Sequence, residues 1–413
     1  MRVKNIFYAN ALAITILAGG CSKEKLDINK NPDDVTDNSV SASVLLPGAL
    51  QNTSRFVAVD WAFLQMWMGY WARSGSYQSL TEIETYKFGN DFQVGIWNNI
   101  YANTNNYNLM QTKATAAGQG MYHAIARIMK AHNFGILVDV YNNVPYFDAF
   151  KGTLVTTPKY DKGADIYKDL FVQLDSAVAI LRRPSATAAA ANPDIATADL
   201  VYKGDATKWL KFAHTLRLRL LMHLHNGLTT TQVAAGFNVA GETAKFSAAG
   251  FEGFMGAGES AHLNPGFSGT KPNPYYRAYV QNEAGTQTGD VFRANDYAIR
   301  YYNADGDPRI SRFYAAPAGA AHKGNLFGRP SDASNLYTGE KLSTVRGPGL
   351  LPDGAASRAW IITSVESLFL QAEARQRNVL TSGATAKARL TAAVRESFVW
   401  LGLTAAQADT YIS

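Results

Sequence analysis

The stretch 199–224, DLVYKGDATKWLKFAHTLRLRLLMHL, decides the fold class of this 413-residue chain. Asp205 is a typical helix N-cap residue, and apolar residues follow it at spacings of three and four. The inner face of the predicted helix consists of Trp209, Phe212, Ala213, Leu216, Leu220 and Leu224, and Arg217 and Arg219 lie off this stripe. Because an apolar helix face must be buried against another element, the pattern predicts a helix packed within a helical domain.

The same periodicity recurs on both sides of this stretch. The other predicted helices cover 40–50, 61–71, 97–110, 121–136, 166–181, 365–374 and 384–401. Gly118 lies between two of them and predicts the turn of a helical hairpin. Residues 229–359 contain many glycines and prolines and no sustained period, which predicts loops with short helices. We therefore predict a mostly α fold, in which a tetratricopeptide-like scaffold of helical hairpins carries a large, irregular, loop-rich insertion.

The first twenty residues are typical of an export signal. Arg2 and Lys4 precede a mostly apolar segment, 6–18, and two glycines lead to Cys21, the only cysteine of the chain. Lipoprotein maturation needs a thiol at the new N-terminus, since that thiol carries the lipid. We therefore predict a signal peptide over 1–20 and lipid attachment at Cys21.

A polar tether is predicted over 21–39, followed by a single domain over 40–413. Removing the signal peptide lowers the formal net charge from +6 to 6 − 2 = +4, because it contains Arg2 and Lys4 and no acid. No cluster of lysine and arginine interleaved with aromatic residues is present, so a nucleic-acid partner is not expected. With one cysteine there is no intramolecular disulfide.

Several segments together resemble the SusD/RagB family of outer-membrane nutrient-binding lipoproteins. They are Asn143–Tyr146 (NVPY), 157–161 (TPKYD) with the helix that follows, 199–219, Asp307–Arg309 (DPR) and 364–374 (SVESLFLQAEA). The resemblance implies a scaffold of tetratricopeptide-like hairpins whose loops form a shallow binding surface. It also implies a lipid-anchored, surface-exposed protein of the cell outer membrane whose partner is a SusC-like, TonB-dependent transporter. Family members usually continue beyond the last helix pair, which suggests a chain truncated at its C-terminus.

Two segments contain the residue types that a sugar requires. A sugar ring presents an apolar face and a rim of hydroxyls, so its site combines flat aromatic rings with hydrogen-bonding side chains. The first segment is 70–78 and the second is 264–279. The predicted ligand-binding residues are Trp71, Arg73, Tyr77, Asn264, Asn273, Tyr275 and Tyr276. Trp71 fits the apolar face of the predicted helix 61–71 equally well.

The sequence favours neither a metal site nor a catalytic site. Asn303, Asp305 and Asp307 have the spacing that opens an EF-hand loop, but the following glycine and glutamate positions hold Pro308 and Tyr314. No nucleophile motif, zinc motif or phosphate loop was found. Paired carboxylates of a glycoside hydrolase are set by the fold and not by spacing, so they remain open. We predict no cofactor, no metal and no enzymatic activity.

The function predicted from these features is nutrient capture at the cell surface. The chain would bind an oligosaccharide and deliver it to a TonB-dependent outer-membrane transporter. Three alternatives stay open: a peptide-binding member of the same family, a glycoside hydrolase, and a helical scaffold that binds only protein. Two or more solvent-facing aromatic residues in the loops 70–80 and 264–280 would favour a glycan, and buried ones would favour the scaffold.

Overall fold

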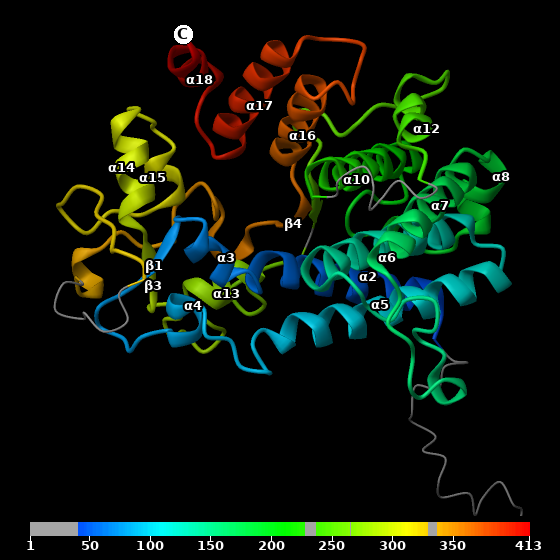
Figure 1. Ribbon diagram of the computed structural model, residues 1–413, viewed down its shortest axis with the longest axis horizontal. Helices are drawn as coiled ribbons and strands as arrows, with labels where there is room; N and C mark the ends of the chain where they lie inside the picture. The colour runs from blue at the N-terminus through cyan, green and yellow to red at the C-terminus, as the bar shows by residue number, and fades with distance from the viewer. Residues whose placement is uncertain (1–39, 228–236, 265, 329–336) are drawn as a thin grey trace, which may run out of the picture. The chain divides into compact units, whose positions relative to one another are not determined.

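The computed structural model describes residues 40–227, 237–264, 266–328 and 337–413 (Figure 1). The predicted signal peptide, tether and lipid-bearing Cys21 lie outside the described residues. Residues Ala42–Ser413 form one unit, and the fold is mostly helical, as predicted.

In the described part of the chain, seven long helices form the scaffold. They are α2 (Ala42–Val59), α5 (Val94–Ala116), α6 (Gly120–Tyr141), α7 (Gly163–Leu181), α10 (Ala206–Gly227), α16 (Ser364–Gln376) and α17 (Ala386–Trp400). The turn between α5 and α6 contains Gly118 at φ +67°, a left-handed conformation that glycine adopts without strain. Helix α6 packs on α5 and α7, and α16 packs on α17 (Figure 1). The predicted hairpins are therefore confirmed.

The rest of the described chain, including the loop-rich insertion, consists of short helices, loops and two small sheets. Strand β1 (Trp71–Arg73) pairs antiparallel with β3 (Phe292–Ala294), and β2 (Ala261–Leu263) pairs antiparallel with β4 (Ala359–Ile362). The shorter helices are α3 (Ala62–Trp67), α4 (Thr81–Thr85), α8 (Pro184–Thr187), α9 (Ile195–Ala198), α12 (Val239–Ala244), α13 (Pro274–Tyr279), α14 (Asp296–Ala304), α15 (Ile310–Phe313) and α18 (Ala405–Ile412). Each strand pair joins a strand of the insertion to a segment far away in the sequence, so the sheets tie the insertion to the chain on either side of it.

Two hydrophobic cores meet along α2. The larger core lies between the scaffold helices and contains Trp209 and Phe212 of α10. The smaller core is made by β1, α13 and α14, with Trp71 and Tyr275 among its buried residues. Helix α2 contacts α5 as well as α13 and β4, and Figure 1 shows it between the two groups of elements. The smaller core therefore rests directly on the helical scaffold.

Several sequence predictions about helices were wrong. The helix predicted over 40–50 continues to Val59 in α2. The helix predicted over 61–71 ends at Trp67, because Gly69 adopts φ +81° and turns the chain into β1. Trp71 therefore lies on a strand and not on a helix. The predicted final pair, α16 and α17, is followed by α18, which the periodicity did not reveal.

The beginning of α10 is organised by two aspartates. The Asp199 carboxylate is fully buried and accepts four hydrogen bonds, from the backbone amides of Val201 (3.0 Å), Tyr202 (3.1 Å) and Gly204 (2.8 Å) and from Trp209 Nε1 (2.8 Å). Asp205 accepts from the Lys208 amide at 3.1 Å and caps the helix, as predicted. Asp199 therefore joins the turn before α10 to the indole at the centre of the larger core.

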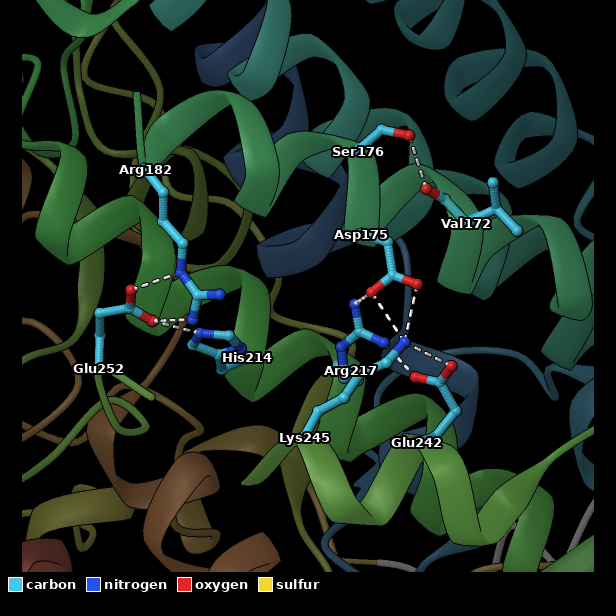
Figure 2. A network of polar contacts seen from close by, with 9 residues as sticks. All are labelled: Val172, Asp175, Ser176, Arg182, His214, Arg217, Glu242, Lys245 and Glu252. Atoms are coloured by element: carbon cyan, nitrogen blue, oxygen red, sulfur yellow. Dashed lines mark hydrogen bonds and ion pairs between the residues drawn. The ribbon is translucent and has the colours of Figure 1, made fainter. Parts of the chain in front are cut away.

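A network of charged side chains fixes the start of the insertion to the scaffold (Figure 2). Arg217 of α10 is buried, although it lies off the apolar stripe. It pairs with Asp175 of α7 at 2.6 Å and with Glu242 of α12, and Lys245 bridges both carboxylates at 2.7 Å. Glu252 likewise pairs with Arg182 and bonds to His214 Nε2, both at 2.8 Å. These pairs neutralise the buried guanidinium and hold residues 242–252 against α7 and α10.

We predict that the protein loses stability as the pH falls below 6.5. His132 of α6 is fully buried, and burial together with the nearby Arg219 lowers its pKa from 6.5 to about 3. Between these pH values the unfolded chain binds a proton that the folded chain does not, so acid favours unfolding. Each pH unit should remove up to about 1.4 kcal/mol through this residue.

Urea unfolding at several pH values measures this effect. His132→Gln removes the titrating group, and its unfolding free energy should fall less steeply with acid than that of the wild type. His123, whose pKa burial lowers to about 4, adds a smaller contribution of the same sign. A stability that stays level from neutral pH down to pH about 4 would contradict the prediction.

Candidate ligand-binding site

The two segments predicted to contain the ligand site lie together in the structure. Trp71 of β1 packs against Tyr275 and Tyr279 of α13, with ring centroids 6.4 and 5.0 Å apart. The rings meet edge to face, which is the favourable arrangement for aromatic pairs. Residues two hundred positions apart in the sequence thus form one aromatic wall.

This wall borders a cavity of about 310 Å³, which we call the aromatic cavity. Its lining includes Trp61, Gln65, Tyr70, Trp71, Tyr275, Tyr279, Tyr302, Phe313, Tyr314, Leu350 and Trp360. Tyr70 keeps 44% of its surface exposed, and Gln65 is exposed as well. The volume lies at the lower end of the range of small-molecule sites, and the lining is predominantly aromatic, as such sites usually are.

Hydrogen bonds hold the tyrosines of this cavity in place. The hydroxyls of Tyr275, Tyr279 and Tyr314 donate to the carbonyls of Val345 (2.7 Å), Val59 (2.8 Å) and Tyr70 (3.0 Å). Burial raises the pKa of Tyr302 to about 12, so its hydroxyl is neutral at physiological pH. The cavity therefore presents rigid, uncharged aromatic surfaces, which suit stacking on an apolar ring face.

Leu350 and Trp360 also line a second cavity of about 410 Å³, which we call the polar cavity. Its other lining residues include Ser260, His262, Asp353, Arg358, Glu396 and Trp400. The indoles of Trp360 and Trp400 meet edge to face at 5.6 Å. Trp360 thus stands between an aromatic and a polar compartment.

Buried asparagines support both compartments. The Asn273 amide donates to the Ser357 carbonyl at 3.0 Å, while its oxygen accepts from the Tyr275 amide at 2.8 Å. Asn295 donates to the Trp71 carbonyl at 3.1 Å, and Asn325 donates to the Arg73 carbonyl at 2.7 Å. Asn295 and Asn325 thus satisfy carbonyls of β1 that strand pairing leaves unpaired, and Asn273 satisfies an amide in the first turn of α13.

Arg73 and Asn273 were predicted to contact the ligand, but the structure buries both side chains. Arg73 is 1% exposed and pairs with the equally buried Glu84 at 3.1 Å, and its guanidinium also donates to the Tyr77 carbonyl at 2.6 Å. Asn273 is fully buried and caps α13. Both side chains use their hydrogen-bonding groups inside the protein, so we assign them structural roles.

The other predicted residues divide into two groups. Trp71 and Tyr275 are buried but line the aromatic cavity. Tyr77 and Asn264 are exposed, and Tyr276 is half-buried with its hydroxyl bonded to Gln281 at 3.3 Å; none of these three lines either cavity. Tyr70 and Tyr77 face solvent, which meets the criterion of two exposed aromatic residues for a glycan, although Tyr275 and Tyr279 are buried.

Trp360 and Trp400 were not predicted. Trp360 lies on β4, where alternation puts it on the face opposite to Ala359 and Ile361. The sequence signal that could have identified Trp360 is its place on the face of the strand opposite to the buried residues, since a tryptophan there is available to a ligand. Trp400 is the last residue of α17, and its position beside Trp360 depends on how α17 packs.

Comparison with known proteins identifies the relationship. A family described as "Starch-binding associating with outer membrane" (SusD-like) matches residues 32–413, nearly the whole chain. The chain belongs to this SusD-like family. The resemblance inferred from the sequence segments is therefore confirmed.

Solved structures of SusD homologues share the fold. A chitin-binding SusD homologue from Flavobacterium johnsoniae superposes with a TM-score of 0.69 at 22% identity, covering 88% of this chain and 72% of that one. A SusD/RagB family protein from Bacteroides thetaiotaomicron gives a TM-score of 0.66 at 20% identity, covering 91% and 75%. A further chitin-binding protein gives 0.66 at 21% identity, covering 90% and 78%. No match was found among curated proteins.

The SusD-like domain shows neither a membrane-spanning helix nor a metal cluster in its described part. None of the helices described is both long and apolar enough to cross a bilayer. Within the same residues, no three histidine, cysteine or acidic side chains converge as metal ligands. Asp307, part of the sequence that resembles an EF-hand loop, is buried and pairs with Arg309 at 2.6 Å.

Proposed function

We propose that this SusD-like protein binds a glycan in the aromatic cavity. The observation that carries the proposal is the convergence of Tyr70, Trp61 and Trp360 around one open, uncharged compartment. Aromatic rings stack on the C–H face of a pyranose, and the exposed Tyr70 and Gln65 leave polar groups at the entrance for its hydroxyls. The family description and the chitin-binding homologues support the same class of ligand.

Affinity electrophoresis tests the proposal. The chain from residue 21 onward, with Cys21→Ser, is run in native gels containing amylopectin or glycol chitin. We expect retardation in at least one gel, and Tyr70→Ala should weaken the affinity about tenfold, because truncating an aromatic contact costs about 1.4 kcal/mol or more.

Tyr160→Ala is the matched control, because Tyr160 is 67% exposed and lines neither cavity. It should be retarded like the unsubstituted protein. Unchanged mobility of a folded protein in all gels would overturn glycan binding and favour peptide cargo or a protein-only scaffold. Equal retardation of the two tyrosine variants would overturn the location of the site.

Hydrolysis of the glycan is not expected. The aromatic cavity has no carboxylate in its lining, so a sugar bound there meets no catalytic acid; Asp353 and Glu396 line the polar cavity and are the pair that an incubation test must examine. A glycosidase needs two carboxyl groups across the scissile bond. Prolonged incubation with amylopectin or glycol chitin should release no new reducing ends, and release that disappears in Glu396→Gln would establish an enzyme.

We further propose that Cys21 carries a lipid and that the protein hands its ligand to a TonB-dependent transporter in the outer membrane. The family's association with the outer membrane supports this location. If the proposal is correct, Cys21→Ala releases the protein from the membrane fraction, and the unsubstituted protein co-purifies with an outer-membrane transporter. Membrane attachment that survives Cys21→Ala would contradict the lipid anchor.

A further inference from the structure

The polar cavity contains an acceptor that the fold does not use. Glu396 of α17 is 7% exposed, and its Oε1 accepts from the Gly258 amide at 2.8 Å and from Ser364 Oγ at 2.5 Å. Its Oε2 accepts no hydrogen bond, and no cation pairs with the carboxylate, within the described part of the chain. Because Oε2 is not one of the fully buried atoms without a partner, it is open to the cavity and can accept a hydrogen bond from a ligand there.

A guanidinium lines the same cavity. Arg358 is exposed and donates from one terminal nitrogen to His262 Nε2 at 3.0 Å. Burial and the nearby Arg358 lower the pKa of His262, so the imidazole is neutral and serves as the acceptor. The described residues provide no carboxylate partner for Arg358, which leaves its other N–H groups available to acceptors in the cavity.

Two indoles complete the compartment. The ring planes of Trp360 and Trp400 meet at 77°. A sugar ring that packs on the face of one indole would therefore contact the edge of the other. The combination of stacking surface, carboxylate acceptor and guanidinium donor matches both the apolar face and the hydroxyl rim of a sugar. The cavity volume of about 410 Å³ falls within the range of small-molecule sites.

We propose that the polar cavity is a second sugar subsite, which holds a hydroxylated pyranose unit of the same glycan. Glu396 Oε2 accepts from its hydroxyls, Arg358 donates to its oxygens, and Trp400 packs on its apolar face. This inference rests on the proposed glycan binding. The two cavities adjoin at Leu350 and Trp360, which line both, so a chain of sugars that crosses Trp360 would contact both cavities. Asp353 and Glu396 outnumber Arg358 in the lining, which favours neutral units over uronic acids.

Titration calorimetry with oligosaccharides of two lengths tests the subsite. The neutral ligands are maltotriose and maltoheptaose, and chitobiose and chitohexaose; hexagalacturonate is the acidic comparison. In the unsubstituted protein the longer oligomer of one pair should bind at least about tenfold more tightly, since it reaches both cavities. Glu396→Gln keeps the shape and an acceptor oxygen but removes the charge, and Trp400→Ala removes the stacking face; each should reduce the affinity for the longer oligomer about tenfold.

Arg395→Gln is the control, because Arg395 is the exposed neighbour of Glu396 and pairs with Asp409 away from the cavity. Circular dichroism melting confirms that each variant is folded. Wild-type affinity of both the Glu396 and the Trp400 variant for both lengths, with Tyr70→Ala still weakened, would overturn the second subsite and leave the proposed function standing. Absence of binding by the unsubstituted protein would overturn both, and tighter binding of hexagalacturonate than of the neutral oligomers would contradict the assigned sugar class.

Discussion

Asp199→Ala is expected to lower the free energy of unfolding by roughly 4 kcal/mol or more. The substitution leaves four donors without their acceptor: three backbone amides and the indole N–H of Trp209. Each unsatisfied buried donor costs about 1–3 kcal/mol. Since a domain has only about 5–15 kcal/mol of stability in total, the variant should be close to unfolding.

Urea unfolding followed by circular dichroism measures this loss, and Asp205→Ala provides the matched control. Asp205 is six residues away and accepts a single bond at the start of the same helix, so its removal should cost about 1 kcal/mol. The loss of unfolding free energy in Asp199→Asn should lie between those of the two alanine variants, because an amide offers one acceptor oxygen and cannot accept at its nitrogen. Equal losses for the two alanine variants would show that Asp199 has no special role.

Arg73→Met is expected to lower the free energy of unfolding by about 3–5 kcal/mol, because it leaves Glu84 buried without its counter-ion. Replacing Glu84 by Met as well should restore a large part of the loss, since an apolar pair of similar size avoids the desolvation cost of the charges. The unsubstituted protein, Arg73→Met, Glu84→Met and the double variant form a double-mutant cycle that can be measured by urea unfolding.

Arg395→Met is the comparison for an exposed pair. Arg395 and Asp409 both keep about half of their side-chain surface exposed, so breaking this pair should cost less than about 1 kcal/mol. The Arg73 experiment also separates two roles of that residue. A stable Arg73→Met protein with weakened glycan affinity would restore Arg73 as a ligand contact, as the sequence predicted.

The sequence was sufficient for the scaffold because apolar periodicity is a local signal. Helices α7 and α10 repeat their buried residues every three or four positions, and both were predicted nearly to their ends. The predicted helix 61–71 was wrong where one glycine, Gly69, interrupts the pattern. Because Gly69 ends the helix, Trp71 lies on a strand and not on the apolar face of a helix.

The site was predicted only by region, because burial there is decided by partners far away in the chain. Arg73 is a residue type that often contacts sugars, but its charge is neutralised by Glu84 inside the protein. Tyr275 is buried by Trp71 and Trp360, which come from two other segments. Residue type and spacing contain no information about such contacts, so the structure was needed to separate lining residues from supporting ones.

The contacts that build the aromatic cavity span long separations in the chain. The Tyr314 hydroxyl bonds to the carbonyl of Tyr70, 244 residues earlier, and the Asn295 amide bonds to that of Trp71, 224 residues earlier. Only three residues separate α5 from α6, so this hairpin can form early. Contacts between residues more than 200 positions apart close long loops, and the chain loses more entropy before such contacts stabilise it. We therefore expect the scaffold to fold first, and the closing of the cavity to be the slow step that sets how soon a new chain can bind.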